Sequence, residues 1–220
     1  MRHALAAALL VLIFANSPAR AEGTMFGGTL SGGRILRVET VYPYVEVGYH
    51  IKVGSSLEIT PNVSFFYGNP MAVDVPVLGN ALGFELRWQL LQKGKFGLSF
   101  LWDFKLMLVY WRSFGIGIQI GTPSVVMNYR IIPRFALVFG YLMPIGLMIN
   151  TQRHPTDRLF QTNFYAAIPI AFRIGGEVSA TSSIFVNFTI DVGPDIIPRN
   201  DFPTILRAYL IARIGVGFRI

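Results

Sequence analysis

Apolar residues at every second position are the sequence feature that most limits what this chain can fold into. The pattern is clearest at the C-terminal end, in the row Leu210, Ala212, Ile214, Val216, Phe218 and Ile220. The residues between them are a mixture of arginine, glycine and larger side chains. Because successive side chains of a strand point to opposite faces, this segment is predicted to be a strand with one wholly apolar face.

The same alternation recurs in eight further segments, which makes nine strand-like stretches. They span residues 45–53, 57–67, 82–90, 96–108, 116–120, 135–149, 164–174 and 184–192. Many reach nine residues or more, whereas strands of globular proteins average about 5–6 residues. A strand that crosses a bilayer needs about 9–11 residues, so the lengths favour a membrane protein.

Composition agrees with a membrane protein but gives no spanning helix. Hydrophobic residues make up 52% of the chain and charged residues only 14%, against about 25% charged residues in soluble domains. The longest apolar candidate, residues 135–149, contains Gly140, Pro144 and Gly146 and is shorter than the roughly 18 residues of a spanning helix. Lipid admits only helices and closed barrels, so we expect a barrel. So little charge also argues against a nucleic-acid partner or a disordered chain.

Residues 1–21 are predicted to be a cleaved secretory signal peptide. Arg2 and His3 precede the apolar run 4–14, and Ala19-Arg20-Ala21 matches an A-x-A cleavage site, which leaves Glu22 as the expected mature N-terminus. Removal of Arg2 and Arg20 lowers the formal charge from +7 to +5. Residues 22–220 are expected to form a single domain.

The connections alternate in length, which predicts the topology. Short turns are expected at 54–56 and 93–95 and somewhat longer ones at 127–133 and 175–183, with long loops at 68–81, 109–115, 150–163 and 193–204. In outer-membrane barrels the short turns face the periplasm and strand numbers are even. A tenth strand is therefore expected within residues 26–41. The predicted fold is all-β: a closed antiparallel up-and-down transmembrane β-barrel of ten strands, with eight as the alternative. Pro61, Pro144 and Pro169 are expected to mark bulges or frayed strand ends.

The chain resembles the small outer-membrane β-barrel proteins of Gram-negative bacteria as a broad class. Ala212, Ile214, Val216 and Phe218 match the alternate apolar positions that these barrels show when counted back from the C-terminus, although the last residue is Ile220 and not phenylalanine. The resemblance implies export to the bacterial outer membrane. It also implies contact with outer-membrane lipid and lipopolysaccharide, and insertion by the barrel-assembly machinery.

The predicted inward face is where function is sought, and we expect its charges to pair because an unpaired buried charge is costly. The candidate lumen network comprises Glu46, His50, Lys52, Glu58, Glu85, Arg87, Asp103, Lys105, Arg173, Asp191, Arg207, Arg213 and Arg219. Such a network could simply fill the lumen, or it could line a selective path or a small-ligand site. A barrel of 8–10 strands has little interior room beyond its side chains, so no wide pore is expected.

The sequence contains few signals for a catalytic, metal-binding or phosphate-binding site. His50 with Glu46 or Glu58 is the one arrangement that suggests hydrolysis, as in barrels that modify lipids, but its sequence context does not match and catalysis is not expected. The chain has no cysteine and lacks a metal-ligand spacing, so neither a metal nor a cofactor is expected. The repeats Gly115-Ile116-Gly117 and Gly215-Val216-Gly217 lack the context of a phosphate loop.

Tyrosine and tryptophan fall mostly near the ends of the predicted strands, as expected at bilayer interfaces. The residues are Tyr42, Tyr44, Tyr67, Trp88, Trp102, Tyr110, Trp111 and Tyr129. The outer-loop residues Arg112, Arg153, Arg158 and Arg199 could bind lipopolysaccharide phosphates or simply be solvated. The sequence favours a non-enzymatic envelope protein with a structural or surface-contact role. A narrow channel for small solutes or lipophilic molecules and a soluble exported lipid-binding barrel remain alternatives.

Overall fold

The computed structural model describes residues 24–30, 33–42, 44–68, 78–110, 114–121, 124–151, 163–200 and 202–220. The predicted signal peptide lies outside these ranges, as do the loop residues Trp111, Arg112, Arg153, His154 and Arg158. No helix within the described ranges is long and apolar enough to cross a membrane.

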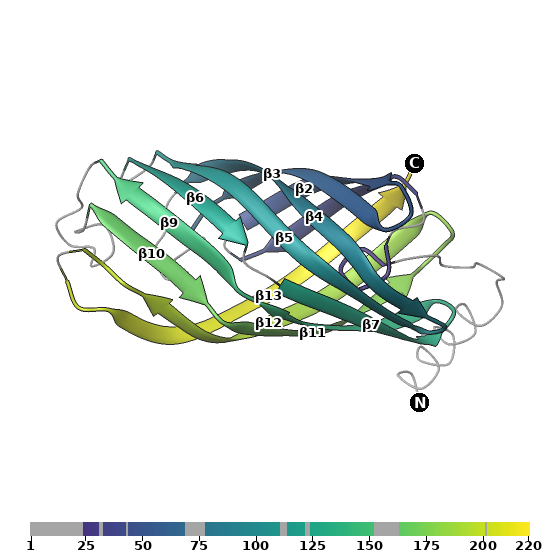
Figure 1. Cartoon of the computed structure of the whole chain (residues 1–220). Helices are drawn as coiled ribbons and strands as arrows, with labels where there is room; N and C mark the ends of the chain where they lie inside the picture. The colour runs from purple at the N-terminus through teal and green to yellow at the C-terminus, as the bar shows by residue number, and fades with distance from the viewer. Residues whose placement is uncertain are drawn as a thin grey trace, which may run out of the picture.

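Thirteen strands form one antiparallel sheet (Figure 1). They are β1 (Ile35–Val41), β2 (Tyr44–Val53), β3 (Leu57–Phe66), β4 (Gly79–Lys93), β5 (Phe96–Val109), β6 (Gly115–Gly121), β7 (Ser124–Ile132), β8 (Phe135–Leu142), β9 (Pro144–Asn150), β10 (Phe164–Pro169), β11 (Ala171–Ser179), β12 (Ile184–Ile197) and β13 (Ile205–Arg219).

The sheet closes into a ring of ten strands. Three pairs of consecutive strands, β6 with β7, β8 with β9 and β10 with β11, each occupy one position in it. Thus β5 pairs with both β6 and β7, and β12 pairs with both β10 and β11. The first and last strands, β1 and β13, pair with each other from Ile35↔Arg219 to Val41↔Arg213. The ring therefore has ten strand positions, and not the eight of the alternative prediction.

The alternation places apolar side chains on the outside of the ring. On β13, Leu206, Leu210 and Ile214 are 71%, 62% and 51% exposed, whereas Tyr209 and Ile211 face inward and are buried. A soluble two-sided sheet would bury its apolar row and expose its polar one. Here the apolar row is the exposed one, as the sequence predicts for the wall of a membrane barrel.

The turns at one end of the ring are short, at 54–56, 94–95, 133–134 and 180–183. The C-terminus lies at the same end (Figure 1). Four of the links at the other end are longer, at 67–78, 110–114, 151–163 and 198–204. The alternation of short turns and long loops predicted from the sequence is thus observed.

Four boundaries predicted from the sequence are wrong. The loop expected at 193–204 begins only after Ile197, where β12 ends. The tenth strand, expected within residues 26–41, covers only β1, because residues 24–30 lie inside the ring and not in its wall. The expected turns at 127–133 and 175–183 are largely strand, since β7 extends to Ile132 and β11 to Ser179. Both stretches place polar side chains on the inward face, such as Asn128 and Glu177, and this gives them the composition of loops.

Two of the three strand prolines mark strand ends, as predicted. Pro144 begins β9 and Pro169 ends β10. Pro61 lies inside β3, where the pairing with β2 stops at Gly48↔Asn62 and resumes at Ile51↔Ile59. A proline lacks the N–H that this ladder requires. The pairing of Pro61 with β4 is uninterrupted.

We expect Gly94→Ala to lower the free energy of unfolding by about 1 kcal/mol, because Gly94 has a φ of 56°, which non-glycine residues adopt only at a cost. No atom lies within 4 Å of the added methyl group, so the effect is purely conformational. Urea unfolding of the protein in detergent micelles measures it. Ser55→Ala, in another exposed turn, serves as the control, and equal stability of the two variants would contradict the prediction.

Candidate functional site

Residues 24–30 run through the interior of the ring near its turn end and are all buried. Side chains of the wall bind the backbone of this segment. Arg87 donates from Nη1 to the carbonyl oxygens of Met25 at 2.9 Å and Gly27 at 3.0 Å. The Ser99 hydroxyl donates to the carbonyl of Gly28 at 2.7 Å, and the carboxylate of Glu177 accepts from the amide of Met25 at 2.7 Å. We call residues 24–30 the inner segment.

Apolar contacts also hold the inner segment. Met25 and Phe26 pack with Ile35, Val138 and Phe185 in a small buried cluster. The guanidinium groups of Arg37 and Arg173 lie 4.8 and 5.9 Å from the centre of the Phe26 ring, distances at which a cation is attracted to an aromatic face. Phe26 therefore separates the apolar cluster from the charged part of the interior.

A fully buried group centred on His50 lies beside the inner segment. His50 Nδ1 is 2.8 Å from a carboxylate oxygen of Glu58 and 3.1 Å from the hydroxyl of Thr60. Glu58 also accepts from Nη2 of Arg87, the arginine that holds the inner segment. Neither His50 nor Glu58 is exposed to solvent. This arrangement fixes the orientation of Arg87 and leaves His50 without access to a substrate outside the ring.

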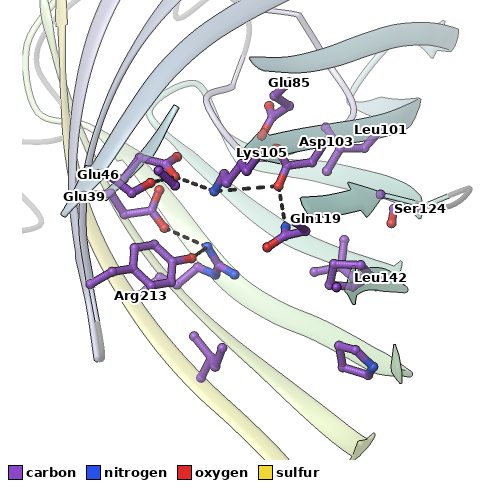
Figure 2. A pocket seen from close by; sticks show the side chains of 18 of the residues that line it. Glu39, Glu46, Glu85, Leu101, Asp103, Lys105, Gln119, Ser124, Leu142 and Arg213 are labelled. Atoms are coloured by element: carbon purple, nitrogen blue, oxygen red, sulfur yellow. Dashed lines mark hydrogen bonds and ion pairs between the residues drawn. The ribbon is translucent and has the colours of Figure 1, made fainter. Parts of the chain in front are cut away.

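A second charged group surrounds Glu46 in the middle of the interior (Figure 2). Its carboxylate accepts from Arg37 Nη2 at 2.5 Å, Lys105 Nζ at 2.5 Å and the Ser64 hydroxyl at 2.9 Å. Lys105 lies 3.7 Å from Asp103, which in turn accepts from the Gln119 amide at 2.8 Å. One carboxylate thus holds two cations that come from opposite sides of β2.

A third charged group is centred on Asp191. Arg173 donates to both of its oxygens, at 2.7 and 2.9 Å, and Arg213 donates to it from Nε at 3.0 Å. Arg213 Nη1 also donates to Glu39 at 3.2 Å and to the Tyr44 hydroxyl at 2.7 Å. Since Glu39 also lies 3.6 Å from Arg37, it joins this group to the group around Glu46. Arg207 and Asp195 form a separate pair at 2.9 Å.

Charged side chains of the groups around Glu46 and Asp191 line a cavity of about 100 Å³, which is room for several water molecules. Phe26 of the inner segment contributes to its lining, together with charged side chains from β1, β2, β4, β5 and β13. Leu142, Pro144 and Ala167 line it from the other side. Glu85 and Asp103, directly opposite each other on β4 and β5, keep 14% and 20% of their side-chain surface exposed.

The structure brings most of the predicted lumen residues together on the inward face. The three charged groups and the separate pair contain Glu46, His50, Glu58, Arg87, Asp103, Lys105, Arg173, Asp191, Arg207 and Arg213, and Glu85 lies 3.9 Å from Arg37. Lys52 is not part of them, since it is exposed beside the turn at 54–56. Arg219 lies at the turn end of the ring, where it donates to the Ser182 carbonyl and stacks on Phe185.

Five buried charged residues are absent from the network predicted from the sequence: Arg37, Glu39, Arg134, Glu177 and Asp195. Arg37 and Glu39 alternate correctly on β1, but the inward row also contains Ile35 and Val41 while Thr40 faces outward, so the two faces look alike. Asp195 follows Pro194 and Glu177 follows two glycines, both of which suggested loops. A search for i, i+2 spacing of charged residues alone would have found Arg37 and Glu39.

No protein-family model and no curated protein matches the chain. Several solved structures are similar in fold. The NanC porin is 12% identical with a TM-score of 0.35, and the alignment covers 86% of this chain and all of that one. The outer-membrane protease OmpT of Escherichia coli is 8% identical with a TM-score of 0.42, covering 91% of this chain and all of the protease.

OmpT, an outer membrane protein of Vibrio cholerae, is 11% identical with a TM-score of 0.37, covering 84% of this chain. The chain spans only 64% of the length of that protein. Two of these proteins are outer-membrane proteins and the third is a porin. With TM-scores below 0.5, these likenesses carry no conclusion about the function of this chain.

We expect Glu46→Gln to destabilise the protein by about 3 kcal/mol, because it leaves the buried cations Arg37 and Lys105 without their shared carboxylate. Glu85→Gln is the matched control. Glu85 is partly exposed and its nearest cation, Arg37, is 3.9 Å away, so the expected loss is below about 1 kcal/mol. Urea unfolding in detergent measures both variants. Equal losses would mean that the Glu46 group contributes no special stability.

Proposed function

We propose that the chain is an integral protein of the bacterial outer membrane, a closed ten-stranded β-barrel with a charge-filled lumen. Its role would be in envelope structure or surface contact and not in catalysis. One observation carries this proposal: large apolar side chains are exposed on the outer face of nearly every strand of the ring, for example Leu82, Phe172, Ile174, Leu206 and Leu210, each more than 60% exposed.

A wall of this kind is unfavourable in water. Burial of apolar surface contributes about 25 cal/mol per Å², and soluble monomers rarely expose apolar patches above a few hundred Å². An outward apolar band flanked by aromatic residues is typical of outer-membrane barrels. Tyr42 and Tyr67 lie in edge-to-face contact at the loop end of the ring, 5.9 Å between ring centres, and are both exposed. They support placing a membrane interface there.

The polar interior argues against a soluble lipid-binding barrel. Such a barrel would need its apolar rows inside, to enclose a hydrocarbon chain. In the described part of the chain, the inward face instead carries buried charged side chains such as Arg37, Glu46 and Asp191. A lipid inside this ring would have to displace them and leave charges unpaired.

The interior equally supports a role that is not enzymatic. His50 is the histidine that would have to serve a hydrolytic site, and its Nδ1 lies within hydrogen-bonding distance of Glu58 and Thr60 in a region closed to solvent. The paired charges and the inner segment leave only a small cavity in the ring. This favours a structural lumen over a permanently open channel for solutes or lipophilic molecules, the second candidate function. Contacts with lipopolysaccharide and with the barrel-assembly machinery belong to the same proposal.

A charge on the outer face tests the membrane location. We expect Ile214→Arg, halfway along the outward row of β13, to weaken insertion into lipid vesicles by about 2–4 kcal/mol. Ile220→Arg, at the strand end, should cost only about 0–1 kcal/mol. Heat-modifiable migration after refolding into vesicles measures the inserted fraction. Insertion of Ile214→Arg at the level of the unmodified chain would speak for the soluble alternative.

Conductance separates the two membrane roles. We expect the refolded protein in planar lipid bilayers to show no sustained current, because charges and the inner segment occupy the lumen. The control is the same bilayer with an open porin. A steady current from the unmodified protein would instead establish the channel alternative.

A further inference from the structure

The cavity of the ring ends on the inner segment. Phe26 is part of the cavity lining, and the remaining residues of the segment occupy the interior between Phe26 and the turn end. The part of the interior next to the segment is walled by small or polar residues such as Ser99, Asn128 and Gly217 and by the larger side chains of Arg87 and Phe185. Without the inner segment, the space occupied by seven buried residues would therefore continue from the cavity toward the turn end.

The inner segment is bound in the manner of a ligand and not built in as a strand. Wall side chains hold it through Arg87, Ser99 and Glu177, and Thr29 donates to the side chain of Asn128 at 2.9 Å. Within the segment, the Thr24 amide donates to the Thr29 carbonyl at 2.9 Å. Among the described residues, none of the segment belongs to the ladders of the sheet. The segment can therefore leave without breaking the ring.

Gly28 lies so close to β5 that no side chain fits at this position. A Cβ atom on Gly28 would stand 2.6 Å from the Leu98 nitrogen and closer still to the Gly97 carbonyl, both of them backbone atoms of β5. Only a residue without a side chain fits there. By contrast, a Cβ on Gly33 would have its nearest neighbour, the Arg219 side chain, at 4.0 Å.

We propose that the ring interior is a path for small ions and that residues 24–30 are its gate, closed in this structure and open when the segment leaves the interior. The inference rests on the proposed membrane barrel and extends it. A cavity of about 100 Å³ lined by charges of both signs suits small hydrated ions and excludes larger nutrients. Charged side chains that line the cavity, such as Arg37 and Asp103, would replace part of the hydration of the ions.

Single-channel recording in planar bilayers tests the gate, with Gly28→Ala compared to Gly33→Ala. The methyl group of Gly28→Ala would collide with the backbone of Gly97. Gly33→Ala adds the same methyl group at a position where there is room. We expect Gly28→Ala to raise the open probability in potassium chloride at least tenfold and Gly33→Ala to leave it unchanged. Equal currents from the two variants, or a silent Gly28→Ala that migrates as a folded barrel, would overturn the proposal.

A reversible disulfide gives a second measurement, which tests whether holding residues 24–30 in place stops the current of Gly28→Ala. The Met25 sulfur lies where a Cβ atom on Gly217 would stand, and the chain contains no cysteine. In Gly28→Ala we would add Met25→Cys and Gly217→Cys. Oxidation should abolish the current and a reductant should restore it. A current that persists while the disulfide is formed would show that the inner segment is not the gate.

Failure of the gate and failure of the membrane barrel give different results. Heat-modifiable migration and vesicle insertion report on the barrel alone. If Gly28→Ala inserts normally but carries no current, the gate proposal fails and the proposed membrane barrel stands. A protein that does not insert loses both.

Discussion

The pairing of β1 with β13 is the interaction on which the rest of the structure depends. Seven residue pairs join the first strand to the last, and without them the sheet would expose two edges of unpaired N–H and C=O groups. Such edges cost several kcal/mol per group in lipid, where no water can satisfy them. The same closure defines an inside and an outside. It thereby turns an alternating sequence into an apolar wall around a polar interior.

Closure also decides which charges meet. Arg213 of β13 reaches Glu39 of β1, 174 residues away in sequence, only because these strands are neighbours. Arg213 also bonds Asp191 on β12, so one arginine links the strands on either side of its own. Buried charges tolerate little freedom, since removal of one partner leaves the other uncompensated. Strand pairing and charge pairing therefore stabilise the same register.

Charged side chains of the wall bind the backbone of the inner segment. Arg87 bonds both Glu58, in the group around His50, and the backbone of residues 25 and 27. Glu177 accepts from two consecutive backbone amides, those of Met25 and Phe26. Because these buried side chains bind backbone atoms, the interior accommodates the inner segment in one particular backbone conformation. A filling by side chains alone would offer no backbone for the wall to bind.

The sequence by itself determined the all-β class, the period-two rows, the short turns at one end and most of the inward charges. These follow from local geometry, because residues i and i+2 of any strand share a face. It left β1, β7 and the end of β11 ambiguous, since their inward faces mix apolar and polar residues. Only the tertiary structure decided that Lys52 lies outside the charged interior, that Arg37 and Glu39 lie within it, and that residues 24–30 fill the ring. Those outcomes depend on register and closure between strands far apart in sequence, which no local pattern encodes.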